Sequence, residues 1–165
     1  MRYTELSGED LGSASSWNAE DLLLAAQEAK ERAFAPLSRF RVGAAVVAKS
    51  GRIYEGCNTE SLIPALSVCA ERNAINHAII HGERSFLAVA VVSDLHAPLL
   101  PCGACVQYLQ EFARQEGRDL LVIAQGRSGD RVVIGLEELF KGGFPSDTPV
   151  KDIQESFRWT TDGEA

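Results

Sequence analysis

Hydrophobic residues along the chain follow two periods, and the changes of period mark the expected helices and strands. Apolar positions at helical spacing follow Asn18, a candidate N-cap, and run to about Phe34, before Pro36 stops the helix. Short apolar runs next to Gly-containing turns, and near-continuous apolar runs, are typical of strands. The expected strands are residues 42–47, 53–54, 86–93, 120–124 and 131–134. The other expected helices are residues 69–81, 103–115 and 136–140.

The order of these elements predicts the fold class. A chain of 165 residues and 17.9 kDa fits one domain. The order α-β-β-α-β-α-β-β predicts an α/β domain, a three-layer α-β-α sandwich with a mixed five-stranded sheet. Crossovers through the two central helices make part of that sheet parallel, and the direction of the last strand stays open. We expect a loose lead-in at 1–17, the domain at 18–145 and a tail at 146–165.

Composition and charge narrow the classes of partner. Apolar residues make up 45% of the chain and charged residues 24%, as in an ordinary globular protein. A formal net charge of −7 argues against a nucleic-acid partner, because neutralising phosphates supplies most of that affinity. The chain shows neither an apolar run of about 20 residues nor the pattern of a secretory signal. We therefore expect a small-molecule substrate, no membrane partner and a cytoplasmic location.

Three of the four cysteines have the spacing of metal ligands. Cys69 opens one expected helix, and Cys102 and Cys105 open the next, on neighbouring faces of its first turn. The free N–H groups and the dipole at a helix start stabilise thiolates. Three protein ligands and a water form the open tetrahedral set of catalytic zinc, so we expect one Zn²⁺ per subunit. Cys57 lies outside this spacing and is expected to be inert, with a closed four-cysteine structural site as the alternative.

Glu71 distinguishes a catalytic zinc site from a structural one. Hydrolysis needs a base to take a proton from water and an acid to return it. Alone, a glutamate in a first turn is more often a surface carboxylate favoured by the helix dipole. Beside Cys69, with PCGAC following at 101–105, we interpret Glu71 as the proton-transfer group. Arg72 either offsets the charge of the thiolates or makes a surface salt bridge, and both interpretations stay open.

These motifs resemble a known enzyme family. CAE followed by PCxxC is similar to the zinc-dependent nucleoside deaminases, and most similar to the small homotetrameric cytidine deaminases with three cysteine ligands. The resemblance covers about residues 33–144, roughly two-thirds of the chain. It includes the blocks APLSRFRVGAAVV, GCNTES, CAERNAI, PCGACVQYLQEF and the late GGF.

The resemblance implies a reaction, an assembly and a set of site residues. The reaction is hydrolytic deamination of cytidine or 2′-deoxycytidine to uridine or 2′-deoxyuridine with release of ammonia, as in pyrimidine salvage. The assembly is a homotetramer whose subunits share active sites. The implied zinc ligands are Cys69, Cys102 and Cys105, with Glu71 as the proton shuttle. The implied substrate contacts are Phe40 against the base, Asn58 and Glu60 on the ribose hydroxyls, the Ala70 backbone beside the base, and Phe144 closing a neighbouring subunit's pocket.

Two positions depart from the family pattern and keep the substrate open. Pro64 stands where the family commonly has an aromatic residue, and Val106 stands where it commonly has arginine. Because residues 61–66 are expected to form part of the pocket wall, a modified cytidine or a blasticidin-like nucleoside antibiotic is an alternative substrate. Glu60 argues against blasticidin, because a differently decorated sugar does not need a ribose-binding carboxylate.

Two further interpretations complete the set. A non-catalytic zinc-binding module is a hypothesis from another class, in which Glu71 would be dispensable. His77 and His81 lie at i, i+4 spacing, as metal ligands sometimes do. Without a carboxylate motif beside them, we interpret this pair as a polar helix face.

Overall fold

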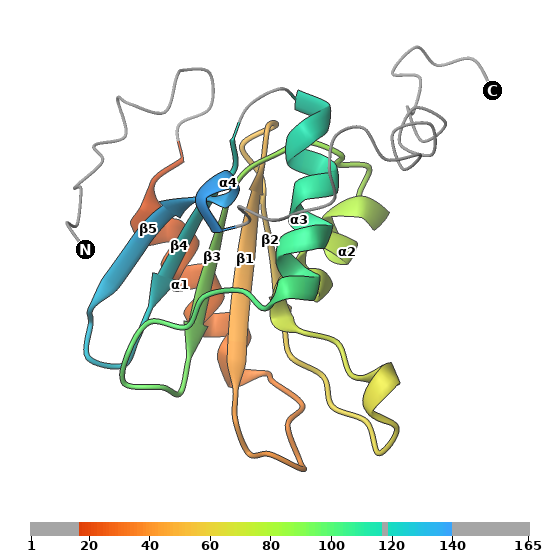
Figure 1. Cartoon of the computed structure of the whole chain (residues 1–165), viewed down its shortest axis with the longest axis vertical. Coiled ribbons are helices and arrows are strands. Elements are labelled where there is room, and N and C mark those ends of the chain that lie inside the picture. The colour runs from red at the N-terminus through yellow and green to blue at the C-terminus, as the bar shows by residue number, and fades with distance from the viewer. Residues whose placement is uncertain (1–16, 117–118, 140–165) are drawn as a thin grey trace.

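The computed structural model describes residues 17–116 and 119–139, and its elements lie within three residues of their expected bounds (Figure 1). The helices are α1 (Ala19–Glu31), α2 (Ala70–Ile80), α3 (Gly103–Glu116) and α4 (Leu136–Leu139), with a 3₁₀ helix η2 (Pro64–Leu66) that the sequence did not predict. The strands are β1 (Val42–Ala48), β2 (Ile53–Cys57), β3 (Phe86–Ser93), β4 (Leu121–Gln125) and β5 (Arg131–Gly135). The tail 146–165 and nearly all of the lead-in 1–17 lie outside the described residues.

The five strands form one mixed sheet in the order β2-β1-β3-β4-β5. Only the β3–β4 pair is parallel, and the other three neighbouring pairs are antiparallel. The chain passes from β2 through α2 to β3, over β1, and from β3 through α3 to β4. Both crossovers therefore join strands of the same direction, as the sequence predicted. The direction that the sequence left open is now defined, since β5 runs antiparallel to β4.

Helices cover both faces of the sheet and form the predicted three layers (Figure 1). Apolar side chains of α2 and α3 pack on one face, and those of α1 pack on the other, in two separate core clusters. Successive residues of a strand point to opposite faces, so Val46 joins the first cluster and Val47 the second. Every residue of β1 is buried, which explains its unbroken apolar run. In the part of the chain that the structure describes, no helix is long and apolar enough to cross a bilayer.

Two glycines allow the helices to lie directly on the sheet. A Cβ at Gly43 of β1 would lie 2.0 Å from the Ala26 carbonyl oxygen of α1. A Cβ at Gly56 of β2 would lie 2.2 Å from the Ala74 nitrogen of α2. Backbone therefore packs on backbone at both places. The contact at Gly56 fixes the position of α2, and with it the place where that helix begins.

Candidate metal centre and active site

The topology brings the starts of α2 and α3 to one edge of the sheet. β2 and β3 run in the same direction, and each is followed by a loop and then by one of these helices. Cys69 is the N-cap residue of α2, and Cys102 immediately precedes α3. Both cysteines therefore lie where free backbone N–H groups and the positive ends of helix dipoles favour negative charge.

The three predicted ligands form a compact triangle of sulfur atoms. The Sγ atoms of Cys69, Cys102 and Cys105 all lie within 4.8 Å of one another. Cys102 Sγ is 3.9 Å from Cys69 Sγ and 3.5 Å from Cys105 Sγ. Zinc–sulfur bonds of about 2.3 Å at tetrahedral angles place sulfurs about 3.8 Å apart, so the triangle has the size that zinc requires. All four cysteines are free thiols, so no disulfide competes with a metal.

Cys57 lies apart from this triangle. Its thiol is directed at the Arg32 carbonyl oxygen, 3.4 Å away. In the part of the chain that the structure describes, the only group of three or more metal-ligating side chains consists of the other three cysteines. A closed four-cysteine site is therefore wrong for this fold.

Cys69 is prepared to act as a thiolate. Hydrogen bonds from the Cys105 thiol and from Arg72 lower the pKa of Cys69 to about 5, although its partial burial opposes the shift. The Arg72 Nη2 atom lies 3.8 Å from Cys69 Sγ and also donates to the Ser67 carbonyl oxygen at 3.4 Å. The Cys105 thiol donates its hydrogen to Cys69, which raises the pKa of Cys105. A metal ion that binds here must therefore displace the thiol proton of Cys105. The contact between Arg72 and Cys69 supports the charge-balancing interpretation of this arginine.

Glu71 is buried in the first turn of α2, with only 4% of its surface exposed. The interpretation as a surface carboxylate is therefore wrong. Burial raises the pKa of Glu71, and the negative charge of Cys69 adds to this shift. A raised pKa brings the protonated form of a carboxyl group closer to neutral pH, which is the property that a proton shuttle needs.

The Asn58 side chain joins the segment after β2 to the start of β1. Its Oδ1 atom accepts from the Val42 nitrogen at 2.8 Å, and its Nδ2 atom donates to the Phe40 carbonyl oxygen at 2.9 Å. An amide has two donor hydrogens and two acceptor lone pairs, so one of each remains for a ligand. Asn58 therefore holds the backbone on both sides of Arg41, in addition to the substrate role that the resemblance implies.

The Glu60 carboxylate accepts hydrogen bonds from residues 37 and 38. Its Oε2 atom accepts from the backbone nitrogens of Leu37 at 2.8 Å and Ser38 at 3.1 Å, and the Ser38 hydroxyl donates to Oε1. The Ser38 hydroxyl bond lowers the pKa of Glu60, so this group is ionised at neutral pH. A carboxylate has about four lone-pair positions, which leaves capacity for a further hydroxyl donor.

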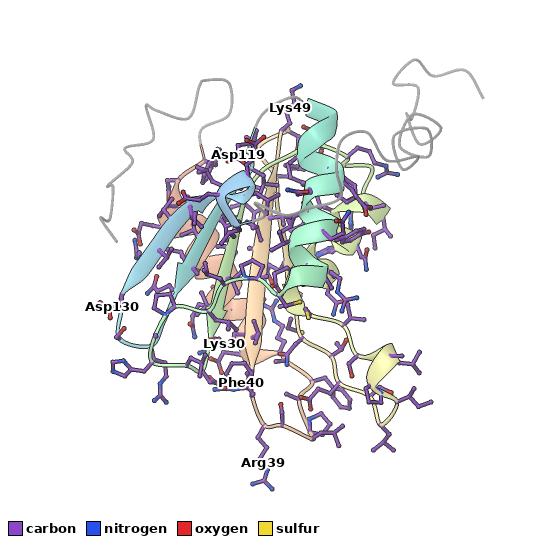
Figure 2. The ribbon with its side chains drawn as sticks, viewed as in Figure 1. Lys30, Arg39, Phe40, Lys49, Asp119 and Asp130 are labelled. Atoms are coloured by element: carbon purple, nitrogen blue, oxygen red, sulfur yellow. The ribbon has the colours of Figure 1, made fainter. Side chains whose placement is uncertain are left out.

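The remaining predicted substrate contacts have different surroundings. Phe40 is partly buried against the core cluster of α2 and α3, and Figure 2 shows it near the start of β1, with Arg39 projecting away from the fold. Ala70 is fully buried directly after Cys69. Phe144 lies outside the described residues.

The two departures from the family pattern occupy different environments. Pro64 begins η2 on an exposed loop, beside Leu62 with 87% of its surface exposed and Ile63 with 59%. Val106 is 4% exposed and belongs to the core between the sheet and α3. The first departure therefore changes an exposed surface, and the second changes the packing behind the cysteines.

Sequence reasoning missed a charged network at the start of β1. Asp94, after β3, accepts from the Arg41 backbone nitrogen at 3.1 Å and from Arg41 Nε at 3.2 Å. The buried Lys30 of α1 lies 3.3 Å from the same carboxylate, and Glu31 pairs with Arg41 at 2.6 Å. The network fixes the backbone next to Phe40. No local pattern predicts it, because Arg41 and Asp94 are 53 positions apart.

Comparisons with known proteins agree with this geometry. Residues 16–117 match the family model described as the cytidine and deoxycytidylate deaminase zinc-binding region. The chain is 38% identical over 130 residues to a cytidine deaminase of Sporosarcina psychrophila, covering 79% of this chain and 93% of that protein. A cytidine deaminase of Halalkalibacterium halodurans is 39% identical over 126 residues, covering 76% of this chain and 93% of that protein.

Solved structures show the same similarity. The structure of cytidine deaminase from Burkholderia pseudomallei has a TM-score of 0.72 and 38% identity, and the match covers 78% of this chain and 100% of that one. Cytidine deaminase from Mycobacterium tuberculosis has a TM-score of 0.67 and 32% identity, covering 79% of this chain and 99% of that one.

Proposed function

Because the chain belongs to the cytidine and deoxycytidylate deaminase family, we propose that it hydrolyses cytidine and 2′-deoxycytidine to uridine and 2′-deoxyuridine, releasing ammonia. The observation that carries this proposal is the buried Glu71, two positions after Cys69, beside a triangle of three sulfur atoms. A structural zinc site has no use for a buried carboxylate at this place. A hydrolytic site requires one.

One zinc ion per chain fits the cysteine triangle, with Cys69, Cys102 and Cys105 as its protein ligands. Three thiolates favour zinc over magnesium or calcium, and three protein ligands leave a fourth position open. When bound, zinc acts as a Lewis acid that lowers the pKa of water. Arg72 offsets part of the negative charge that three thiolates bring to the site.

Glu71 moves two protons in the reaction. Its carboxylate accepts a proton from water, and the resulting hydroxide adds to C4 of the pyrimidine while Glu71 protonates N3. Glu71 then takes the proton of the new C4 hydroxyl and gives it to the amino nitrogen. The bond between C4 and the amino nitrogen breaks, and ammonia leaves. The elevated pKa of the buried Glu71 supports this alternation between proton acceptor and donor.

The substrate is held by residues of several segments around the metal site. Phe40 packs against the base and the Ala70 backbone orients it, while Asn58 and Glu60 bind the ribose hydroxyls, with Glu60 as an acceptor. The ionised state of Glu60 supports its role as an acceptor for a hydroxyl. Phe144 is assigned to the pocket of a neighbouring subunit.

A homotetramer with shared active sites completes the proposal. Three large apolar side chains of one loop are exposed in the single chain, namely Leu62 at 87%, Ile63 at 59% and Leu66 at 63%. Apolar surface of this kind favours burial against another chain. We place the enzyme in the cytoplasm, in pyrimidine salvage, where reducing conditions keep its four cysteines as thiols.

A modified cytidine is the second candidate substrate, and Pro64 is the observation that favours it. Proline begins η2 beside exposed aliphatic side chains, where the family commonly has an aromatic ring. A wall of this kind changes the shape and polarity offered to the substrate without changing the metal site.

Ammonia release tests the proposal and separates the two candidates. Zinc-loaded protein is assayed with cytidine, 2′-deoxycytidine, free cytosine and a panel of modified cytidines, with the nucleoside product identified by chromatography. Turnover of cytidine and 2′-deoxycytidine, with little turnover of cytosine, is the expected result. Turnover of modified nucleosides alone would show that a modified cytidine, the second candidate substrate, is the true one. Failure of every nucleoside with zinc bound would contradict the proposal.

A further inference from the structure

The far end of α2 carries a pair of histidines that the proposed reaction does not use. His77 and His81 are both exposed, and their ring centroids lie 4.9 Å apart. At 1.5 Å of rise per residue, His77 lies roughly 12 Å along the helix from Cys69, so the pair is separate from the sulfur triangle.

The hydrogen bonds of the two rings define which nitrogen is free. His77 Nδ1 lies 2.9 Å from the Glu55 carbonyl oxygen on β2, and His81 Nδ1 lies 2.8 Å from the His77 carbonyl oxygen. A carbonyl oxygen can only accept, so each Nδ1 atom carries the hydrogen. In the neutral rings, both lone pairs are therefore on Nε2. Metal-ligating histidines show the same arrangement, in which the other ring nitrogen donates to a carbonyl or carboxylate and fixes the ring.

The spacing of the rings suits a shared metal ion. Metal–nitrogen bonds of about 2.0–2.1 Å place an imidazole centroid about 3.2 Å from the metal, so two adjacent ligands have centroids about 4.5–5.2 Å apart. The observed 4.9 Å lies within this range.

Tyr54 holds both rings in place from the sheet. Its ring centroid lies 5.4 Å from that of His77 and 5.5 Å from that of His81. Its hydroxyl donates to Glu83 at 3.2 Å, and Ser50 donates to the same carboxylate oxygen at 2.6 Å. Tyr54 itself is buried, so the two histidines rest on a fixed surface.

We propose that His77 and His81 form a second metal site, which binds a borderline divalent cation such as Ni²⁺, Cu²⁺ or Zn²⁺ through their Nε2 atoms. Imidazole suits these cations, whereas Mg²⁺ and Ca²⁺ prefer oxygen ligands. Water completes the coordination, so the site is weaker than the three-cysteine site. Binding joins His77 in the last turn of α2 to His81, the C-cap residue of that helix, and stabilises the folded chain by mass action. The proposal does not depend on the deaminase reaction.

A nickel titration of the zinc-loaded protein tests this site directly. The chain contains three histidines, and the third, His96, is exposed on the loop after β3. Nuclear magnetic resonance of the imidazole rings therefore resolves three ring systems in the unmodified protein. Paramagnetic Ni²⁺ is expected to broaden the signals of His77 and His81 at concentrations that leave His96 sharp. Loosely bound zinc is removed beforehand, and the zinc content, measured in parallel, stays at the one ion per chain that the three cysteines hold.

Calorimetry with matched variants gives a second readout. His77→Gln and His81→Gln are each expected to weaken nickel binding by about tenfold or more, and His96→Gln leaves it unchanged. Equal broadening of all three histidines, loss of binding in the His96 variant, or absence of binding at millimolar Ni²⁺ would overturn the proposal. The titration of unmodified protein decides the question even if a glutamine variant proves unstable.

Discussion

The candidate site has two halves, one built from the starts of two helices and one built from loops. The metal half consists of Cys69, Glu71, Cys102 and Cys105, at the starts of two helices. Cys105 and Glu71 are 0% and 4% exposed. The proposed substrate half consists of Phe40, Asn58, Glu60 and the loop 61–66, where Leu62 is 87% exposed.

This difference separates the chemistry of the reaction from the recognition of its substrate. The starts of α2 and α3 position the three cysteines, and Glu71 is buried in the first turn of α2. The proposed sugar contacts, Asn58 and Glu60, are partly buried, and the apolar side chains of the loop that follows them are exposed. We therefore expect substitutions in the metal half to abolish turnover and substitutions in the substrate half to change affinity or assembly.

The largest expected effect follows from removing a sulfur ligand. Cys105→Ser should weaken zinc binding by about a hundredfold or more and reduce cytidine turnover to background. Cys57→Ser is the matched control, because Cys57 lies outside the triangle. Zinc content by mass spectrometry and ammonia release measure both results. A Cys57 variant that loses zinc, or a Cys105 variant that keeps zinc and turnover, would contradict the division into halves.

The next largest effect concerns the exposed loop. Leu62→Ser combined with Ile63→Ser should dissociate the assembly and lower cytidine turnover by about a hundredfold, because truncating well-buried apolar anchors removes several kcal/mol of association energy. Zinc content should stay at one per chain. Leu24→Ser, on α1, is a control with an apolar side chain that is 58% exposed. Sedimentation measures the assembly, and a monomeric wild-type enzyme with full turnover would contradict this prediction.

A smaller effect is expected from Glu60. Glu60→Gln removes the charge from an acceptor of hydrogen bonds, and charge-assisted bonds contribute about 1.5–3 kcal/mol, so kcat/KM for cytidine should fall about 10- to 100-fold. Turnover of free cytosine should be unaffected. Glu55→Gln is the control, because Glu55 lies on β2 and pairs with Arg32. If turnover of cytidine and of cytosine fell equally, Glu60 would only hold the 37–38 loop in place and would not bind the sugar.

The smallest effect on turnover is expected from a substitution of Asp94. This substitution should instead lower the stability of the fold. Asp94→Asn leaves the buried Lys30 without its counter-charge and should lower the free energy of unfolding by about 2–3 kcal/mol. Burial raises the pKa of Asp94, but hydrogen bonds from Arg41 outweigh it and hold this pKa below its ordinary value of 3.8.

The pH dependence of stability follows from the direction of that shift. A depressed carboxyl pKa contributes stability that is present above the unfolded-state value and is lost as pH falls through the folded-state value. The wild type should therefore lose more of its unfolding free energy than Asp94→Asn when the pH falls below about 4. Denaturant titrations at several pH values measure both quantities. Identical acid sensitivity in the two proteins would contradict the role of Asp94.

The parts of this site that sequence could predict depend on local signals. The helix starts at Cys69 and Gly103 follow from periodicity and from short ligand spacings, and the burial of β1 follows from its unbroken apolar run. The placement of Glu71 next to Cys69 predicts its chemistry, and the fold then explains its raised pKa through burial.

The parts that sequence could not predict depend on contacts between distant residues. Arg41 precedes β1 and Asp94 follows the neighbouring strand β3, and no local sequence pattern predicts that these two residues pair. The hydrogen bonds of Asn58 to the backbone of residues 40 and 42 could not be predicted, because they depend on the pairing of β1 with β2. The direction of β5 could not be predicted either, because it depends on which strand β5 pairs with. In the structure, β5 pairs with β4 and runs antiparallel to it.

The most direct test of the account measures zinc content and cytidine turnover together in Glu71→Gln. Glutamine preserves the shape of the side chain and removes its ability to carry a proton, and general acid–base groups contribute up to about 10⁴-fold. We expect one zinc per chain and turnover lower by about this factor. Turnover within about tenfold of the wild type, with zinc bound, would show that Glu71 does not transfer the protons and would contradict the central claim.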